Sequence, residues 1–89
     1  MDFLDKRIED YSQIFSDREP SLLKEIHDYT LQNVPQPRML SGHLQGRFLS
    51  MISKIKRPKK ILEIGTYTGY SALCMAEGLD EKGELITID

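Results

Sequence analysis

The sequence predicts an α/β fold in which a helical N-terminal segment leads into one strand–helix–strand unit. Two observations carry this prediction. Up to Pro58 the apolar side chains recur at intervals of three and four residues, which is the period of amphipathic helices. After Pro58 the pattern changes to two short apolar runs, separated by a glycine-containing turn and a helical stretch. This order predicts a right-handed βαβ unit with parallel strands behind a helical extension.

The first helix is expected around residues 4–15, where four apolar side chains form one stripe. They are Leu4, Ile8, Tyr11 and Phe15. Residues 17–20 interrupt this stripe, and Pro20 suits the first turn of a second helix, because its missing N–H costs nothing there. A second stripe runs over residues 22–30. Residues 33–37 contain two prolines and end that helix, because proline does not fit a helix interior.

A third helix is expected from Ser41, a residue type that suits an N-cap, to Pro58, which stops it. Its apolar face is expected to comprise Leu44, Phe48, Met51 or Ile52, and Ile55. We therefore divide the chain into a helical extension of about three helices, residues 1–58, and the start of a ligand-binding domain, residues 59–89.

The strand–helix–strand unit follows directly. Residues 61–64 form an apolar run bounded by lysines and a glycine, which is typical of a central parallel strand. Residues 70–78 predict a helix. Its apolar contacts are expected from Ala72, Leu73, Met75, Ala76 and Leu79. A polar turn at residues 80–83 precedes a second strand, rich in β-branched residues, at residues 85–88.

The composition excludes several classes of function. With 39% hydrophobic and 29% charged residues the chain resembles an ordinary globular protein, and a net charge of −2 argues against general nucleic-acid binding. Residues 1–7 carry charges without an apolar core, unlike a signal peptide, and no apolar run approaches the roughly 18 residues of a membrane span. The single cysteine, Cys74, is expected to be a small buried side chain in a reducing compartment. We predict a cytoplasmic protein with neither a nucleic-acid nor a membrane partner.

The turn after the first strand contains Gly65 and Gly69. Gly65 can take backbone angles closed to other residues and leaves room for a ligand, and Gly69 is expected to let the next helix start close to the strand. Two glycines alone fit a plain strand-to-helix turn equally well. The spacing excludes a dinucleotide fingerprint, which needs glycines at 67 and 70, and a phosphate-binding P-loop, which needs four residues between its glycines and then a lysine. The turn therefore fits a nucleoside-bearing ligand without a pyrophosphate.

Two acidic residues narrow the ligand class. Glu63 lies within an apolar strand, where an unpaired carboxylate is costly, so we expect it to face the mouth of the strand and to meet a cationic or N–H partner. Asp89 ends the second strand, near the position at which dinucleotide folds bind ribose hydroxyls. A ligand with a ribose diol, an ammonium and a carboxylate satisfies both acidic residues and the helix N-terminus. S-adenosylmethionine has all three groups and no phosphate.

Residues 63–71, Glu-Ile-Gly-Thr-Tyr-Thr-Gly-Tyr-Ser, resemble the first motif of the S-adenosylmethionine-dependent O-methyltransferases of the catechol and caffeoyl-CoA type. In that family an aromatic residue replaces the middle glycine of the wider methyltransferase motif, as Tyr67 does here. The strings Arg-Glu-Pro at 18–20 and Gly-Arg-Phe-Leu-Ser-Met at 46–51 also resemble the caffeoyl-CoA branch. The resemblance covers roughly residues 18–89. It implies a Rossmann-like class I methyltransferase fold, of which this chain holds the N-terminal helices and the first strand–helix–strand unit.

The resemblance implies that three side chains surround the methionine part of the cofactor. Ser41 would approach the methionine end, and Glu63 would face the amino group, directly or through water. Ser71 would donate a hydrogen bond to the methionine carboxylate. For Ser41 and Ser71 the alternative is simple helix capping.

It also implies how the rest of the cofactor is held. Gly65 and Thr66 would contribute backbone to the cofactor wall, with Tyr67 beside them in the same motif. Asp89 would hold the ribose hydroxyls.

Enzymes of this family use a divalent cation, Mg²⁺ or similar, held by aspartates and an asparagine, to bind and deprotonate the acceptor hydroxyl. The family places these ligands beyond the second strand, so we expect neither metal ligands nor catalytic residues within this chain. We expect the full-length protein to methylate a small acceptor, catechol-like or an acyl-CoA-linked phenol. The 89 residues alone, a truncated N-terminal portion, are expected to be inactive.

Two alternatives stay open. One is a methyltransferase of the same fold that uses another acceptor atom or no metal. The other is a non-catalytic truncated relative that acts as a binding or dimerisation module. The apolar stripe of the first helix fits a homodimer contact and packing on the parent protein's own core equally well.

Overall fold

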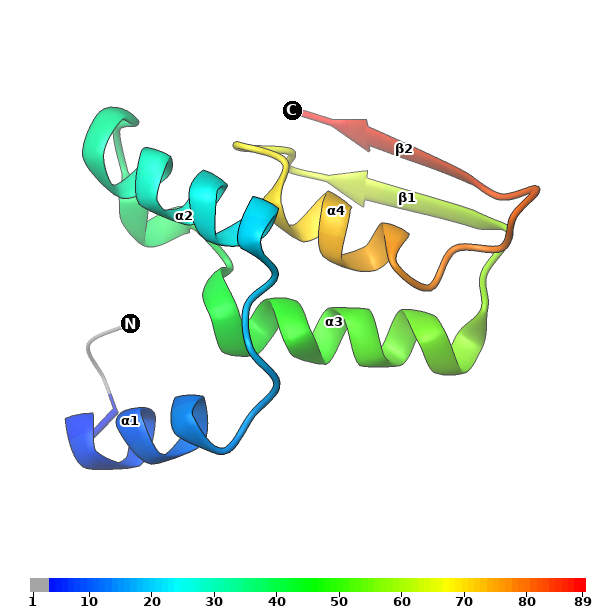
Figure 1. Cartoon of the computed structure of the whole chain (residues 1–89). Helices are drawn as coiled ribbons and strands as arrows, with labels where there is room; N and C mark the ends of the chain where they lie inside the picture. Colours follow the sequence, from blue (N-terminus) through cyan, green and yellow to red (C-terminus); the bar gives the residue numbers. More distant parts are fainter. Residues whose placement is uncertain (1–3) are drawn as a thin grey trace.

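The computed structural model describes residues 4–89 and confirms the predicted order of three helices, a strand, a helix and a strand, with one short helix, η1, that was not predicted (Figure 1). The helices and strands are α1 (Lys6–Ile14), α2 (Ser21–Asn33), η1 (Pro37–Met39), α3 (Gly42–Lys56), β1 (Lys60–Ile64), α4 (Tyr70–Ala76) and β2 (Glu84–Ile88). Residues 1–3 lie outside the described residues. They belong to the N-terminal segment, residues 1–7, that we judged unlike a signal peptide. Within the described chain, no helix is long and apolar enough to cross a membrane.

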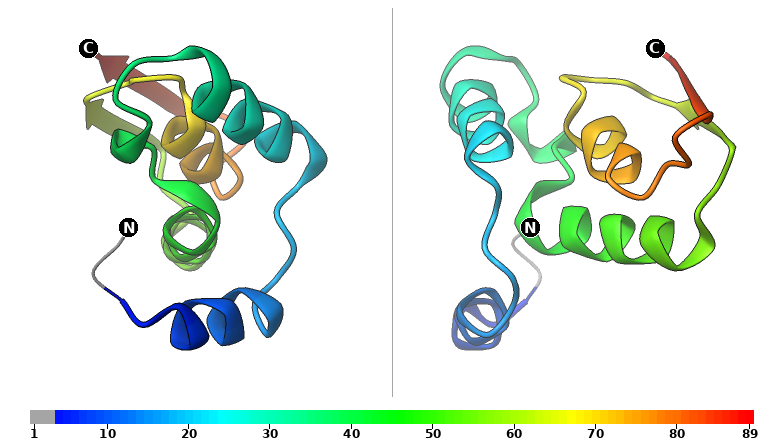
Figure 2. Two further views of the ribbon diagram at one scale, coloured as in Figure 1. Left: turned by 90° about the vertical axis from the view of Figure 1, so that its left-hand side faces the viewer. Right: turned by 45° about the vertical axis from the view of Figure 1, so that its right-hand side comes forward.

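The two strands pair in parallel, from Lys60 opposite Glu84 to Ile64 opposite Ile88. The connecting helix α4 lies against one face of the pair, and α3 lies beyond α4 (Figures 1 and 2). Side chains alternate between the two faces. Half-buried side chains are Ile61, Glu63, Leu85 and Thr87, whereas more than half of each side chain is exposed at Leu62, Ile64, Ile86 and Ile88. One face of the sheet is therefore apolar and bare.

Small residues let α4 pack closely on α3. Gly46, Ser50 and Ser53 are the buried residues of α3. A Cβ atom at Gly78, just after α4, would lie 2.2 Å from the carbonyl carbon of Ser53, so only glycine fits there. Cys74 is fully buried in this contact, and burial raises the pKa of its thiol. The prediction of a small buried side chain at Cys74 is confirmed.

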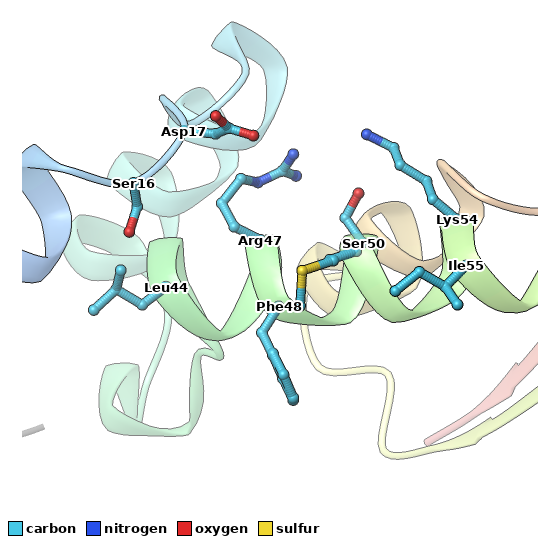
Figure 3. A pocket seen from close by; sticks show the side chains of 9 residues that line it. Ser16, Asp17, Leu44, Arg47, Phe48, Ser50, Lys54 and Ile55 are labelled. Atoms are coloured by element: carbon cyan, nitrogen blue, oxygen red, sulfur yellow. The ribbon is translucent and has the colours of Figure 1, made fainter.

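The predicted apolar face of α3 does not form the contact with α4. Phe48 and Ile55 are 55% and 77% exposed, and both line an open groove of about 600 Å³ along α3 (Figure 3). The core instead consists of Leu23, Tyr70 and Cys74, with Ile26, Leu40 and Leu49 packed against it. The helical period predicted where α3 lies, but the small residues on its other side decide which face meets α4.

Helix α4 also differs from its prediction. It ends at Ala76 rather than near Gly78, and the next two N–H groups make turn-type hydrogen bonds, from Glu77 to the Cys74 carbonyl oxygen at 3.3 Å and from Gly78 to that of Met75 at 3.4 Å. The buried side chains of this helix are Tyr70, Ala72 and Cys74, whereas Leu73 and Ala76 are exposed. The surface of α4 that packs on α3 includes Tyr70 and Cys74, which both lie next to Gly46, whereas the predicted contact residue Leu73 is exposed.

Helix α1 lies apart from the sheet, joined to α2 by residues 15–20 (Figure 2). It has no buried residue, and more than half of each side chain is exposed at Ile8, Tyr11 and Phe15. Tyr11 and Phe15 contact each other with ring centroids 4.7 Å apart. The predicted stripe is thus a surface feature, and its role in a homodimer or in packing on other parts of the protein stays a prediction.

Glu77 joins α4 to α3 through charged hydrogen bonds. Its carboxylate accepts from Arg47 at 2.8 and 3.0 Å and from the Ser50 hydroxyl at 2.8 Å. The Arg47 guanidinium, with help from Ser50, holds the pKa of Glu77 below its ordinary value of 4.5. Since the pKa is lower in the folded state, this stabilisation is complete above about pH 4.5 and is lost as the pH falls through the folded-state pKa.

We expect Glu77→Gln to lower the free energy of unfolding by about 1 kcal/mol at pH 7, at the low end for a charged hydrogen bond because the site is partly exposed. The difference from the unaltered protein should shrink as the pH falls below 4. Urea unfolding of the complete protein between pH 3 and 7 measures both effects. Glu25→Gln, an exposed residue of α2, is the control. A pH-independent difference would contradict the assignment.

Candidate functional site

The turn between β1 and α4, residues 65–69 and here named the glycine turn, bends at the carboxyl end of β1. Gly65, Tyr67 and Gly69 have φ of +106°, +50° and +86°, and the Gly65 N–H donates to the Ile88 carbonyl oxygen at 2.6 Å. A Cβ at Gly65 or Gly69 would meet no atom within 4 Å. At Gly65 both the unusual angle and the open space match the prediction. At Gly69 only the positive φ requires glycine, so the prediction that its missing side chain is needed for the helix to start close to the strand is wrong.

Five of the seven predicted site residues line one small pocket beside the glycine turn. They are Ser41, Gly65, Thr66, Tyr67 and Ser71. The pocket has a volume of about 50 Å³, which is room for one end of a ligand the size of a nucleoside derivative. Ser41 reaches it from the start of α3, together with Met39 and Leu40. Residues far apart in the sequence thus meet at the carboxyl end of β1.

Glu63 lies at the centre of a network of hydroxyl groups. Its carboxylate accepts hydrogen bonds from the hydroxyls of Ser71 and, at 2.8 Å, Thr87. Thr87 Oγ1 lies 2.6 Å from Thr66 Oγ1. Within residues 4–89 the partners of Glu63 are therefore hydroxyls, and the expected cationic or N–H partner is not among them. The reason is the strand register, which sets Thr87 directly opposite Glu63 on the face that meets α4.

Thr87 was missed by the sequence analysis. The available signal was the alternation of the strands, because Glu63 and Thr87 occupy equivalent positions in two short parallel runs. Sequence alone does not establish the register that pairs them.

Helix capping does not account for the two serines. Ser41 occupies the N-cap position of α3, but its side chain makes no capping hydrogen bond. The N-cap residue of α4 is Gly69, and the Ser71 hydroxyl donates to Glu63 instead. Both serines line the pocket, and their contact with a ligand stays a prediction.

Asp89 lies beside the glycine turn at the end of β2. Its Oδ1 accepts a long hydrogen bond, 3.4 Å, from the Tyr67 N–H, and the residue is exposed. An exposed carboxylate at this edge can accept hydrogen bonds from the hydroxyl groups of a ligand.

The Tyr67 side chain ties the glycine turn to the helical extension. Its hydroxyl lies 2.8 Å from the Pro35 carbonyl oxygen and 2.9 Å from that of Gln36. Gln36 has a left-handed conformation, φ +61°, and leads into η1. The prolines predicted only that α2 ends in this region, because the short helix that follows depends on contacts with a turn far along the chain.

The two histidines contact the connection between α1 and α2. His43 Nε2 lies 2.5 Å from the Asp17 carbonyl oxygen, and His27 Nδ1 lies 3.0 Å from Glu19 Oε2. Across residues 4–89 no group of three or more histidine, cysteine or acidic side chains is placed to hold a metal ion. That the metal ligands lie in another part of the protein stays a prediction.

We expect Tyr67→Phe to loosen residues 34–41, because the Pro35 and Gln36 carbonyl oxygens lose their shared donor. The free energy of unfolding should fall by about 1 kcal/mol. Hydrogen–deuterium exchange should become faster in this segment and stay unchanged in β1. Tyr29→Phe, an exposed tyrosine of α2, is the control. Unchanged exchange over residues 34–41 would show that the hydroxyl does not hold this segment.

The sequence matches known proteins over most of its length. A family model described as O-methyltransferase matches residues 12–89. Caffeoyl-CoA O-methyltransferase 1 of Zea mays is 40% identical over 72 residues, which are 81% of this chain and 28% of that protein. Caffeoyl-CoA O-methyltransferase 1 of Arabidopsis thaliana is 39% identical over 72 residues, which are 27% of its length. The chain thus spans under a third of the length of these relatives.

Solved structures share its fold. An SAH-bound methyltransferase of Podospora anserina superposes with a TM-score of 0.86 at 34% identity, over 94% of this chain and 36% of that one. An O-methyltransferase of Bacillus cereus in complex with SAH gives a TM-score of 0.78 at 30% identity, over 93% and 37% of the two chains. The helices and the first strand–helix–strand unit are therefore those of a Rossmann-like class I methyltransferase, as the resemblance implied, and the chain belongs to the O-methyltransferase family.

Proposed function

We propose that the full-length protein transfers a methyl group from S-adenosylmethionine to a hydroxyl group of a small acceptor. The observation that carries this proposal is the gathering of Ser41, the glycine turn and Ser71 around one pocket, with Glu63 and Asp89 beside it. Family membership supports the reaction type, and the SAH bound to the two similar structures supports the cofactor.

The donor set of the site fits the methionine end of this cofactor. Glu63 is a carboxylate that can accept hydrogen bonds from an ammonium group, and Ser71 is a hydroxyl that can donate to a carboxylate. In this structure the Ser71 hydroxyl donates a hydrogen bond to the Glu63 carboxylate. We propose that the Ser71 hydroxyl turns from Glu63 to the ligand carboxylate, while Glu63 accepts from the ammonium in its place. Thr87 keeps Glu63 oriented in both arrangements, through its 2.8 Å hydrogen bond.

The other end of the site fits a ribose. Gly65 and Thr66 offer backbone without a bulky side chain at the carboxyl end of β1, and the space in front of Gly65 is open. Asp89 is exposed next to Tyr67 and has two carboxylate oxygens that can accept from a pair of neighbouring hydroxyls. This arrangement binds and orients the cofactor, with Ser41 closing the wall near the methionine end and Tyr67 beside Asp89 at the other.

When bound, S-adenosylmethionine supplies a methyl group activated by its positive sulfonium sulfur. The transfer breaks the methyl carbon–sulfur bond, forms a carbon–oxygen bond and releases the acceptor's hydroxyl proton. We propose that a divalent cation, Mg²⁺ or similar, assists at the acceptor hydroxyl, and that its ligands lie in a part of the protein outside this chain. The plant relatives, named for caffeoyl-CoA, support a catechol-like or acyl-CoA-linked phenolic acceptor.

We further propose that residues 59–89 begin the cofactor-binding domain and that residues 1–58 are its helical extension. The bare apolar face of the sheet and the exposed stripe of α1 support two expectations. The rest of the protein covers the bare face of the sheet. A second copy of the protein, or the rest of the domain, covers the exposed stripe of α1.

Asp89→Ala should weaken S-adenosylmethionine binding by the complete protein at least tenfold, because the ribose hydroxyls lose a charged acceptor. Isothermal titration calorimetry measures the dissociation constant. Glu84→Ala removes an exposed carboxylate from the opposite end of the same strand and should leave it unchanged. If both variants bind the cofactor as the unaltered protein does, the assignment of Asp89 is wrong.

The 89 residues alone should bind S-adenosylmethionine at least a hundredfold more weakly than the complete protein and should self-associate through the bare face of β1 and β2. Analytical ultracentrifugation and a cofactor titration of this chain test both points. A monodisperse chain that binds the cofactor tightly would favour the alternative of a non-catalytic binding module.

A further inference from the structure

A second polar cluster contacts α4 at its first residue, Tyr70. The Tyr70 hydroxyl donates a hydrogen bond to Glu19 Oε2, and His27 Nδ1 lies 3.0 Å from the same oxygen. The His27 ring meets the Tyr70 ring edge-on, with centroids 6.2 Å apart and planes at 88°. The Glu19 side chain is only 12% exposed, although it comes from the connection between α1 and α2 (Figure 1). Glutamate side chains are seldom buried to this extent unless they are paired.

Tyr70 is fixed from several sides. It is 2% exposed, and α3 approaches it so closely that a Cβ at Gly46 would lie 2.8 Å from its ring. Burial, and next the hydrogen bond to Glu19, raise the pKa of Tyr70 well above its ordinary value, so its hydroxyl remains a donor at neutral pH. A buried hydroxyl needs an acceptor, and among the described residues Glu19 supplies it.

Tyr70 also belongs to the cofactor site by position. It lines the same small pocket as Ser41, Thr66 and Ser71, and it separates Gly69 from Ser71 in the sequence. A shift of the Tyr70 ring therefore moves both the pocket wall and the backbone that aims the Ser71 hydroxyl. Glu19 itself does not line this pocket.

We propose that Glu19 is a positioning residue: it holds Tyr70, and through Tyr70 the glycine turn and Ser71, in the geometry that binds the methionine end of the cofactor. This inference rests on the proposed function. Its consequence is that the connection before α2, 51 residues from Tyr70 in the sequence, contributes to cofactor affinity without touching the cofactor.

The test compares four variants of the complete protein. Glu19→Leu leaves the buried Tyr70 hydroxyl without its hydrogen-bond acceptor. Tyr70→Phe removes the donor, and the double variant removes both. Glu19→Gln keeps an oxygen that can accept from Tyr70. Glu25→Leu, an exposed glutamate of α2, is the matched control. The readouts are the dissociation constant for SAH by calorimetry, at a temperature where each variant is folded by circular dichroism, and the unfolding temperature.

Glu19→Leu should weaken SAH binding roughly tenfold, Tyr70→Phe roughly fivefold, and Glu19→Gln less than about twofold. The double variant should resemble Tyr70→Phe, because the two side chains act through one contact. A merely structural role for Glu19 would lower the unfolding temperature and leave the dissociation constant of the folded variant unchanged.

Normal SAH binding by folded Glu19→Leu and Tyr70→Phe variants overturns the inference and leaves the proposed function intact. If Glu19→Leu does not fold, Tyr70→Phe decides, since it removes a single oxygen atom: a fivefold loss supports the inference and an unchanged affinity overturns it. If the unaltered protein does not bind SAH, the proposed function fails and the inference falls with it.

Discussion

The hydrogen bond from the Gly65 N–H to the Ile88 carbonyl oxygen, 2.6 Å long, determines where the candidate site can form. It continues the parallel pairing of β1 and β2 one residue past β1, so the glycine turn starts beside Asp89. The same pairing sets Glu63 opposite Thr87 on the face toward α4. If the register shifted by one residue, Glu63 or Thr87 would turn away from α4, and the hydrogen bond between them would be lost. The acidic and hydroxyl groups of the site therefore depend on the backbone geometry of two short strands.

The helical extension takes part in building this site. Three residues of the glycine turn and of α4 contact it: Tyr67 through the Pro35 and Gln36 carbonyl oxygens, Thr68 through Thr30 at 3.1 Å, and Tyr70 through Glu19. The change of sequence pattern after Pro58 separates a helical part from a strand-containing part. In three dimensions, however, the helical part supplies one wall of the pocket and the contacts that hold the turn.

One part of the molecule is closely packed, and another part presents bare apolar surface. The interface of α3 and α4 uses glycine, serine and cysteine, so the two backbones approach closely, and the Arg47–Glu77 pair lies beside it. The larger apolar side chains of α1, of one sheet face and, apart from Leu44 and Leu49, of α3 remain on the surface. Exposed apolar surfaces of this size commonly mark contact sites.

The sequence by itself determined the order and type of the helices and strands, the glycine turn and the family, because helical periods, strand alternation and turn residues are properties of neighbouring positions. It also predicted five residues that the structure gathers in one pocket, from the motif at 63–71 and from Ser41. Only the tertiary structure decided that Glu63 meets Thr87 and Ser71, that the small face of α3 is the packed one, and that Glu19 reaches Tyr70. These contacts join residues as many as 51 positions apart, and such pairs are set by the path of the backbone and by the space that small side chains leave.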